Sequence, residues 1–201
     1  MTDNFKIEKP TEAVSEGAVS ERKPVVVDPD WKEKLYSPER LEKYARGEIK
    51  LRDLHAISGP EMIYIAEMGY NLFQQGRYKD AKIIYDGLVA LDPSIWYFHA
   101  ALGAIQLEAK EAGLADEEFS LDAALKHLNQ ALELNPKDIA SCVNRAEVYL
   151  YQAKILDAVN DLKAAVEMDP EGTNEQGLRA RRLAQEMLAA IEREEAKKES
   201  K

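Results

Sequence analysis

YKDAKIIYDGLVALDP, residues 78–93, ends in a short phrase that the chain uses three times. The phrase is Leu91-Asp92-Pro93 at this point, Leu134-Asn135-Pro136 further on, and Met168-Asp169-Pro170 at its last use. Pro136 and Pro170 are 34 residues apart, and Pro93 and Pro136 are 43 apart, which is nine more than 34. A recurring step of this size indicates an internal structural repeat.

Counting back from each proline finds the same kinds of residue in all three copies. An alanine lies twelve positions before it, a large residue eight before, and a further apolar residue five before. These residues are Ala81, Tyr85 and Leu88, then Ala124, Leu128 and Ala131, then Ala158, Leu162 and Ala165. This pattern and the 34-residue period are typical of tetratricopeptide repeats, in which each repeat is a pair of helices. The sequence therefore predicts an all-α solenoid of three helix pairs.

The first helix of each pair needs a small residue where its partner approaches closely. Met68-Gly69 and Leu102-Gly103 supply one, while Arg145-Ala146 keeps the small residue but departs from the pattern at the arginine. The nine extra residues of the second repeat lie between Gly103 and Ala124, where we expect a longer first helix followed by an acidic loop. The three predicted repeats are residues 62–95, 96–138 and 139–172.

The residues before the repeats fall into two segments. Residues 1–30 are rich in Glu, Lys, Ser, Thr and Pro and poor in aromatic residues, so we expect a disordered N-terminal tail. Residues 31–61 predict an N-terminal helical segment. Within it, Ser37 and Pro38 are suited to start a helix, and a second short helix is expected over residues 51–57.

The residues after the repeats predict one more helix. In residues 173–193, Thr173 to Gln176 have the form of a capping box, and apolar residues follow at helical spacing. We interpret this segment as an amphipathic capping helix that covers the last repeat, because its polar face mixes Glu and Arg. Residues 194–201 are a charged tail.

The charge of the chain excludes several classes of partner. Its 201 residues include 27 Lys and Arg against 37 Asp and Glu, which gives a net charge of -10. Nucleic acids and anionic membranes are bound by clustered Lys and Arg, so neither partner fits. We expect basic or apolar segments of other proteins instead, although an acidic surface also serves solubility alone.

No pattern in the chain points to catalysis. His55, His99 and His127 lie on different predicted helices without further ligands at metal spacing, and no nucleotide, zinc-protease or hydrolase motif is present. Cys142 is the single cysteine, so it is expected to be an inert core thiol. We therefore predict no enzyme activity, no metal and no cofactor. Residues 1–30 contain no apolar run long enough for a leader or membrane span, which predicts a cytoplasmic protein.

The first helices of such repeats line the concave face of the solenoid. The residues that we expect there are aromatic or aliphatic, with small residues between them, and they form the predicted peptide-binding surface. They are Ile63, Ala66, Tyr70 and Phe73 in the first repeat, Tyr97, Ala100, Ala104 and Leu107 in the second, and Val143, Asn144, Glu147, Leu150 and Tyr151 in the third. This composition suits an extended apolar or proline-containing peptide of a client protein.

Part of the sequence resembles the class II chaperones of bacterial type III secretion. The resemblance covers LRDLHAIS at residues 51–58, GYNLFQQGRY at residues 69–78, and the end of the first repeat. Those chaperones hold hydrophobic translocator subunits in the cytoplasm before export. Residues 97–106, which contain Leu102-Gly103-Ala104, are similar to the second repeat of that family. Over the third repeat the likeness is generic.

The resemblance implies a groove that takes a short extended client segment and an N-terminal helical segment used for homodimerisation. It also marks Tyr70, Phe73 and Tyr97 as groove residues. Another tetratricopeptide mode grips the C-terminal carboxylate of heat-shock chaperones with Lys, Arg and Asn. Ala66 and Tyr70 stand at such positions, which disfavours that mode here. The acidic insertion, the N-terminal tail and the long C-terminal helix depart from the family.

Two hypotheses for the function stay open. The first is a chaperone-like protein that holds an apolar client segment in its groove. Residues 24–29, PVVVDP, are an alternative, intramolecular occupant of the same groove. The second is a scaffold or adaptor that assembles a bacterial multiprotein complex without a secretion role. Substitutions in the groove would abolish binding in the first case. Neutralising Asp116, Glu117 and Glu118, or removing residues 1–30, would abolish it in the second.

Overall fold

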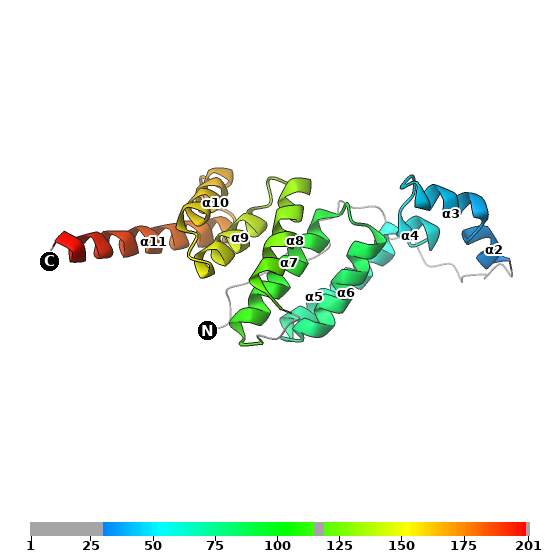
Figure 1. The fold of residues 1–201 in the computed structure, drawn as a ribbon, viewed down its shortest axis with the longest axis horizontal. Coiled ribbons are helices and arrows are strands. Elements are labelled where there is room, and N and C mark those ends of the chain that lie inside the picture. The colour runs from blue at the N-terminus through cyan, green and yellow to red at the C-terminus, as the bar shows by residue number, and fades with distance from the viewer. Residues whose placement is uncertain (1–29, 115–118, 200–201) are drawn as a thin grey trace. The chain divides into compact units, whose positions relative to one another are not determined.

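The computed structural model of the chain describes residues 30–114 and 119–199. These residues are all-helical and contain no strand (Figure 1). Residues 1–29 of the expected N-terminal tail lie outside the described residues, and so do Asp116, Glu117 and Glu118 of the acidic insertion. The described residues divide into an N-terminal unit, residues 30–99, and a C-terminal unit, residues 100–199, which we describe in turn.

The N-terminal unit contains a helical segment and then the first predicted repeat. Its helices are α2 (Trp31–Leu35), α3 (Pro38–Ala45), α4 (Leu51–Leu54), α5 (Gly59–Gln74), α6 (Tyr78–Leu91) and the first residues of α7 (Trp96–Glu111). As predicted, Ser37 caps α3 by accepting a hydrogen bond from the backbone N–H of Arg40, and Pro38 occupies the first turn. The short helix expected over residues 51–57 ends earlier, at Leu54, because Ala56 takes a positive φ of 56°.

Helices α5 and α6 form an antiparallel pair with a dense interface. Ser58 and Glu61 form a capping box that starts α5, and Gly76, with a φ of 71°, makes the turn between the helices. A Cβ atom added to Gly69 would lie 2.9 Å from ring atom Cε2 of Tyr85. The Met68-Gly69 step therefore serves the close approach that the sequence predicted.

Asp92 joins the end of α6 to α4. Its side chain is buried, and its carboxylate lies 2.7 Å from Nζ of Lys50 and 3.2 Å from Nε of Arg52. Burial alone would raise the pKa of Asp92, but hydrogen bonds from Lys50 and Ser94 outweigh it and hold the pKa below its usual value. The charged form of Asp92 thus helps to hold α4 against the first repeat.

The repeated phrase has the same local role at each of its three sites. The side chains of Asp92 and Asn135 each accept a hydrogen bond from the backbone N–H two residues on, at 3.1 and 3.3 Å. Asp169 accepts from the N–H groups four and five residues on, both at 3.0 Å. Each phrase therefore ends a helix and satisfies the backbone of the connection that follows.

The C-terminal unit contains the rest of α7 and four further helices. These are α8 (Leu121–Leu134), α9 (Ile139–Tyr151), α10 (Ile155–Met168) and α11 (Glu175–Glu199). As expected, the first helix of the second repeat is longer: α7 continues for eight residues after Gly103, whereas α5 and α9 each continue for five residues after Gly69 and Ala146. Three of the nine extra residues therefore lengthen α7, and the other six belong to the connection between α7 and α8.

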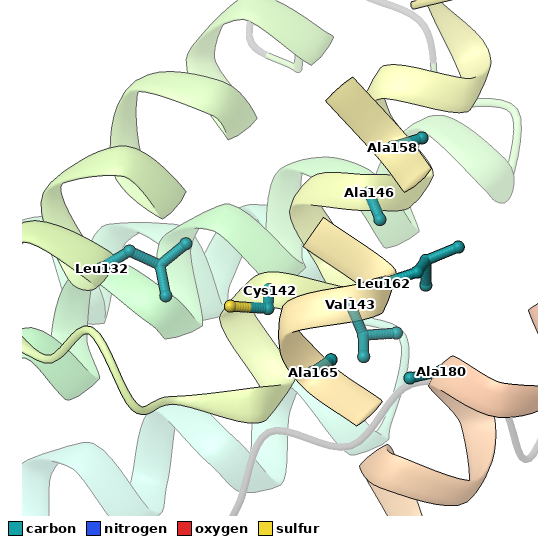
Figure 2. Packing of buried hydrophobic residues seen from close by; sticks show 8 residues of the cluster. All are labelled: Leu132, Cys142, Val143, Ala146, Ala158, Leu162, Ala165 and Ala180. Atoms are coloured by element: carbon teal, nitrogen blue, oxygen red, sulfur yellow. The ribbon is translucent and has the colours of Figure 1, made fainter. Parts of the chain in front are cut away.

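The core of this unit is built from the small and branched residues that the repeat pattern marks. Ala158, Leu162 and Ala165 of α10 pack against Val143 and Ala146 of α9, together with Leu132, Cys142 and Ala180. Figure 2 shows Ala180 entering this cluster from α11. A second cluster joins Leu107 of α7 to α8 and α9 through Ala124, Leu128 and Val148.

Two details at α9 and α11 differ from the repeat pattern. Arg145 stands where the pattern has an apolar residue, and it donates two hydrogen bonds of 2.7 Å to the carboxylate of Asp161. The predicted capping box at the start of α11 does not form as expected. Thr173 bonds to Asp169, and the side chain of Asn174 accepts from the N–H of Gln176 at 2.7 Å.

Among the described residues, no helix has the length and apolar character needed to cross a membrane.

Candidate peptide-binding surface

In the N-terminal unit, three of the five predicted surface residues lie in the interior. Ala66, Phe73 and Tyr97 are buried, while Ile63 and Tyr70 are half-buried. The buried side chains cannot contact a client without a rearrangement of the helices that cover them. Of the predicted surface residues on α5, Tyr70 and Ile63 are therefore the two that a client can reach.

The burial of Tyr97 has a specific cause. Its hydroxyl lies 3.3 Å from the hydroxyl of Tyr85, which donates a hydrogen bond of 3.0 Å to the carbonyl oxygen of Ala66. The rings of Tyr97 and Tyr85 also meet edge to face, with centroids 6.2 Å apart. Phe73 packs in the same manner against Tyr78, at 5.8 Å. In this structure both rings are packing residues, whereas the sequence placed them on the open groove.

In the C-terminal unit, five more of the predicted residues are buried. Ala104, Leu107 and Val143 are apolar core residues, and Asn144 and Glu147 are buried polar residues. Ala100 and Leu150 are half-buried, and Tyr151 is exposed over 55% of its surface. The reachable part of this surface therefore consists of the C-terminal end of α9 and of Ala100 on α7.

Asn144 and Glu147 are buried because an arginine of α11 reaches them. The guanidinium of Arg179 donates to Oδ1 of Asn144 at 3.2 Å and forms an ion pair with Glu147. Burial raises the pKa of Glu147 to about 7, although the charge and hydrogen bond of Arg179 act in the opposite direction. The two residues are thus partners of α11 in this structure.

Tyr151 is held by an acidic residue of α7. Its hydroxyl donates a hydrogen bond of 2.6 Å to Oε1 of Glu111. Burial, the hydrogen bond to Glu111 and the nearby negative charges of Glu147 and Glu108 raise the pKa of Tyr151 to about 12. The phenol is therefore neutral at physiological pH and acts as a fixed aromatic surface with one satisfied polar end.

Sequence reasoning missed Arg179 and Glu111 as parts of this surface. A signal for Arg179 was present, because Ala180 follows Ala146 by one repeat period of 34 residues. Helix α11 thus continues the register of the first helices. Glu111 carried no such signal, because it lies at the end of α7, next to the insertion.

Among the described residues, no group of His, Cys, Asp or Glu side chains is arranged to hold a metal ion.

Comparison with known sequences finds partial relatives. No family model matches the chain. Sperm-associated antigen 1 of Rattus norvegicus is 28% identical over 173 residues, which is 84% of this chain and 17% of that protein. Hsp70-Hsp90 organizing protein 1 of Glycine max is 35% identical over 82 residues, which is 41% of this chain and 14% of that protein. The chain therefore spans less than a fifth of the length of these relatives.

Comparison with solved structures finds the same fold in proteins of nearly the same extent. A type III secretion complex from Aeromonas hydrophila has a TM-score of 0.63 and 17% identity, covering 77% of this chain and 98% of that one. The Yersinia enterocolitica chaperone SycD, in complex with a peptide of the translocator YopD, has a TM-score of 0.56 and 23% identity, covering 69% and 98%.

A third structure comes from a different setting. The first tetratricopeptide domain of Spaghetti (RPAP3), bound to an HSP90 peptide, has a TM-score of 0.54 and 20% identity and covers 66% of this chain and 96% of that one. The likeness to the translocator chaperones expected from the sequence is thus confirmed for the fold. The described residues thus form an all-helical, tetratricopeptide-type fold, which the chain shares with the type III secretion translocator chaperone SycD and with the first tetratricopeptide domain of RPAP3.

Proposed function

We propose that this chain is a non-catalytic, cytoplasmic protein-binding module that holds an extended apolar segment of a client protein. The observation that carries the proposal is that each unit has a reachable tyrosine on a first helix of a repeat, Tyr70 on α5 and Tyr151 on α9. Aromatic side chains are frequent anchors of peptide and protein interfaces, because they bury a large area for few rotatable bonds. Ile63 and Leu150, which are half-buried, add apolar area on the same two helices.

The solved neighbours support peptide binding by this fold. SycD is seen with a translocator peptide and RPAP3 with an HSP90 peptide, so the fold serves two kinds of client. The surface of this chain favours the first kind. Ala66 is buried and Tyr70 is half-buried, where a grip on a terminal carboxylate needs cationic and amide groups.

The experiment is affinity capture from the native cytoplasm, followed by binding of overlapping synthetic peptides from the captured protein. Chains with Tyr70→Ala or Tyr151→Ala are compared with the wild type and with Tyr64→Ala, a tyrosine of α5 that is 56% exposed and outside the predicted surface. We expect one apolar segment to bind, and each of the first two substitutions to weaken its binding about tenfold. Equal binding by all four chains would remove the groove from the proposal.

The scaffold hypothesis remains the second candidate. It is favoured by the likeness to Hsp70-Hsp90 organizing protein 1, whose name describes an assembly role. In that case the captured proteins are folded partners, and their binding survives Tyr70→Ala and Tyr151→Ala. Neutralising Asp116, Glu117 and Glu118 together, or deleting residues 1–30, is then the change that releases them.

We also propose a homodimer through the N-terminal helical segment. Helix α3 is strongly amphipathic, yet none of its residues is buried, and Leu41 and Tyr44 are exposed on it. An apolar helix face of this kind gains free energy when a second copy covers it.

A further inference from the structure

Helix α11 covers part of the surface that the sequence predicted for a client. Arg179 is itself buried, and it contacts Asn144 and Glu147 of α9. The next residue, Ala180, belongs to the same apolar cluster as Val143 (Figure 2). Three of the five α9 residues that were expected to face a peptide, Val143, Asn144 and Glu147, are therefore in contact with a segment of the chain itself.

The contacts of α11 are weaker than those within the pair α9 and α10. Ala180 is the one fully buried apolar residue among the described residues of α11, and Leu183, Ala184 and Met187 are only partly buried. By contrast, α9 and α10 bury Ala146, Ala158, Leu162 and Ala165 completely. A helix with little buried apolar area opens at lower free energy than the core does.

The polar contact does not compensate for this small area. Taking the charges of Arg179 and Glu147 out of water costs free energy that largely offsets their attraction. The ion pair therefore contributes geometry and specificity more than net stability. A group with the same donors can replace the guanidinium of Arg179 at little cost, since Asn144 and Glu147 present only acceptor oxygens to it.

We propose that α11 is a removable occupant of the surface on α9, and that a client segment carrying an arginine beside apolar residues competes with Arg179 for Asn144 and Glu147. This inference rests on the proposed function, because it names the class of client segment and the way its site is regulated. In the absence of a client, α11 protects the apolar surface of α9 from solvent. When a client binds, its arginine takes the place of Arg179, and α11 leaves α9.

The test uses the chain's own α11 as the probe, since that sequence is known to fit the site. A fluorescein-labelled peptide with the sequence of residues 175–190, EQGLRARRLAQEMLAA, is titrated with three full-length chains and followed by fluorescence anisotropy. The chains are the wild type, Arg179→Gln, and the matched control Arg193→Gln, which removes an exposed arginine from the same helix. A second peptide carries glutamine in place of its Arg179.

We expect the first peptide to bind the Arg179→Gln chain about tenfold more tightly than the wild type or Arg193→Gln, because the resident helix competes less well. The second peptide, which has glutamine in place of Arg179, should not show this tenfold tighter binding to the Arg179→Gln chain. Equal binding to all three chains, or no binding to any of them, would overturn the proposal. Loss of cooperative thermal unfolding in Arg179→Gln would also overturn it, since α11 would then be an integral part of the fold.

Hydrogen exchange of the wild-type chain gives an independent reading. Amides of α11 should exchange through an opening of lower free energy than amides of α9 and α10. Exchange of α11 only through global unfolding contradicts a removable helix. Neither measurement involves Tyr70 or a client, so the proposed function can stand when this inference fails.

Discussion

Leu128 packs directly against the backbone of Gly103: a Cβ atom added to Gly103 would lie 2.5 Å from Cγ of Leu128. This contact brings α7 and α8 together at the small residue that the repeat requires. The contact is tighter than the one between Gly69 and Tyr85 in the first pair. It makes Gly103 a position where the side chain of alanine is already too large.

The first prediction compares two helical glycines. Gly103→Ala should destabilise the fold by about 1–3 kcal/mol, because Leu128 must move in a packed interior. Gly87→Ala is the matched control, since a Cβ atom there meets nothing within 4 Å, and it should stabilise α6 by about 0.5–1 kcal/mol. Urea unfolding followed by circular dichroism measures both. If both substitutions changed the free energy of unfolding in the same direction, the close approach of α7 and α8 would be contradicted.

A second prediction concerns pH and Glu147. The pKa of Glu147 is raised to about 7 in the folded chain, against 4.5 for the ordinary group. The folded state therefore holds more protons than the unfolded state between these values, so this contribution to stability falls as the pH rises from about 4.5 to 7. Glu147→Gln should reduce this loss of unfolding free energy with rising pH by up to about 2 kcal/mol.

Urea unfolding of the wild type and Glu147→Gln at pH 5.0 and 8.0 checks this prediction. Glu167→Gln is the control, because that carboxylate is exposed on α10. The stability of the glutamine variant relative to the wild type should be higher at pH 8.0 than at pH 5.0. A relative stability that does not change with pH would show that burial does not raise the pKa of Glu147.

The third prediction tests the departure at Arg145. Arg145→Leu restores an apolar residue at this place in the repeat, but it leaves the buried carboxylate of Asp161 without its two hydrogen bonds. We expect a loss of about 2–4 kcal/mol from this single change. The double change Arg145→Leu with Asp161→Leu should recover most of it, because both charges are then gone. Additive losses in the two single variants would argue against a direct pair.

A fourth prediction addresses the dimer. Replacing Leu41 and Tyr44 together by serine should convert a dimer into a monomer, because it removes the exposed apolar face of α3. Light scattering coupled to gel filtration measures the mass of each chain. Leu156→Ser, which changes an 80% exposed leucine of α10, should leave the mass unchanged. A monomeric wild type would contradict the dimer.

The sequence predicted the repeat core because core residues obey the period. Ala81, Ala124 and Ala158 stand in the same register, and all three are completely buried. Tyr85, Leu128 and Leu162, four residues later, lie one helical turn further on the same face and are buried as well. A pattern that repeats every 34 residues thus determines which face of each helix meets its neighbours.

The sequence could not predict in the same way which of the groove residues point their side chains to the open surface and which to the interior. One residue step turns a helix by about 100°, so the residues beside the groove alternate between open surface and interior. Tyr97 goes to the interior because the hydroxyl of Tyr85 gives it a partner, and no repeat pattern encodes that pairing. Asn144 and Glu147 are covered by Arg179, which lies 32 or more residues away in the chain.

The position of Cys142 has a practical consequence for all of these experiments. The single sulfhydryl of the chain is buried in the cluster of α9 and α10, and burial raises its pKa to about 12. The thiolate, which is the form that reacts with maleimides and oxidants, is therefore nearly absent at neutral pH. A cysteine introduced on the surface can be labelled selectively while Cys142 stays in place, and a dimer that persists in the presence of a reducing agent is held by noncovalent contacts.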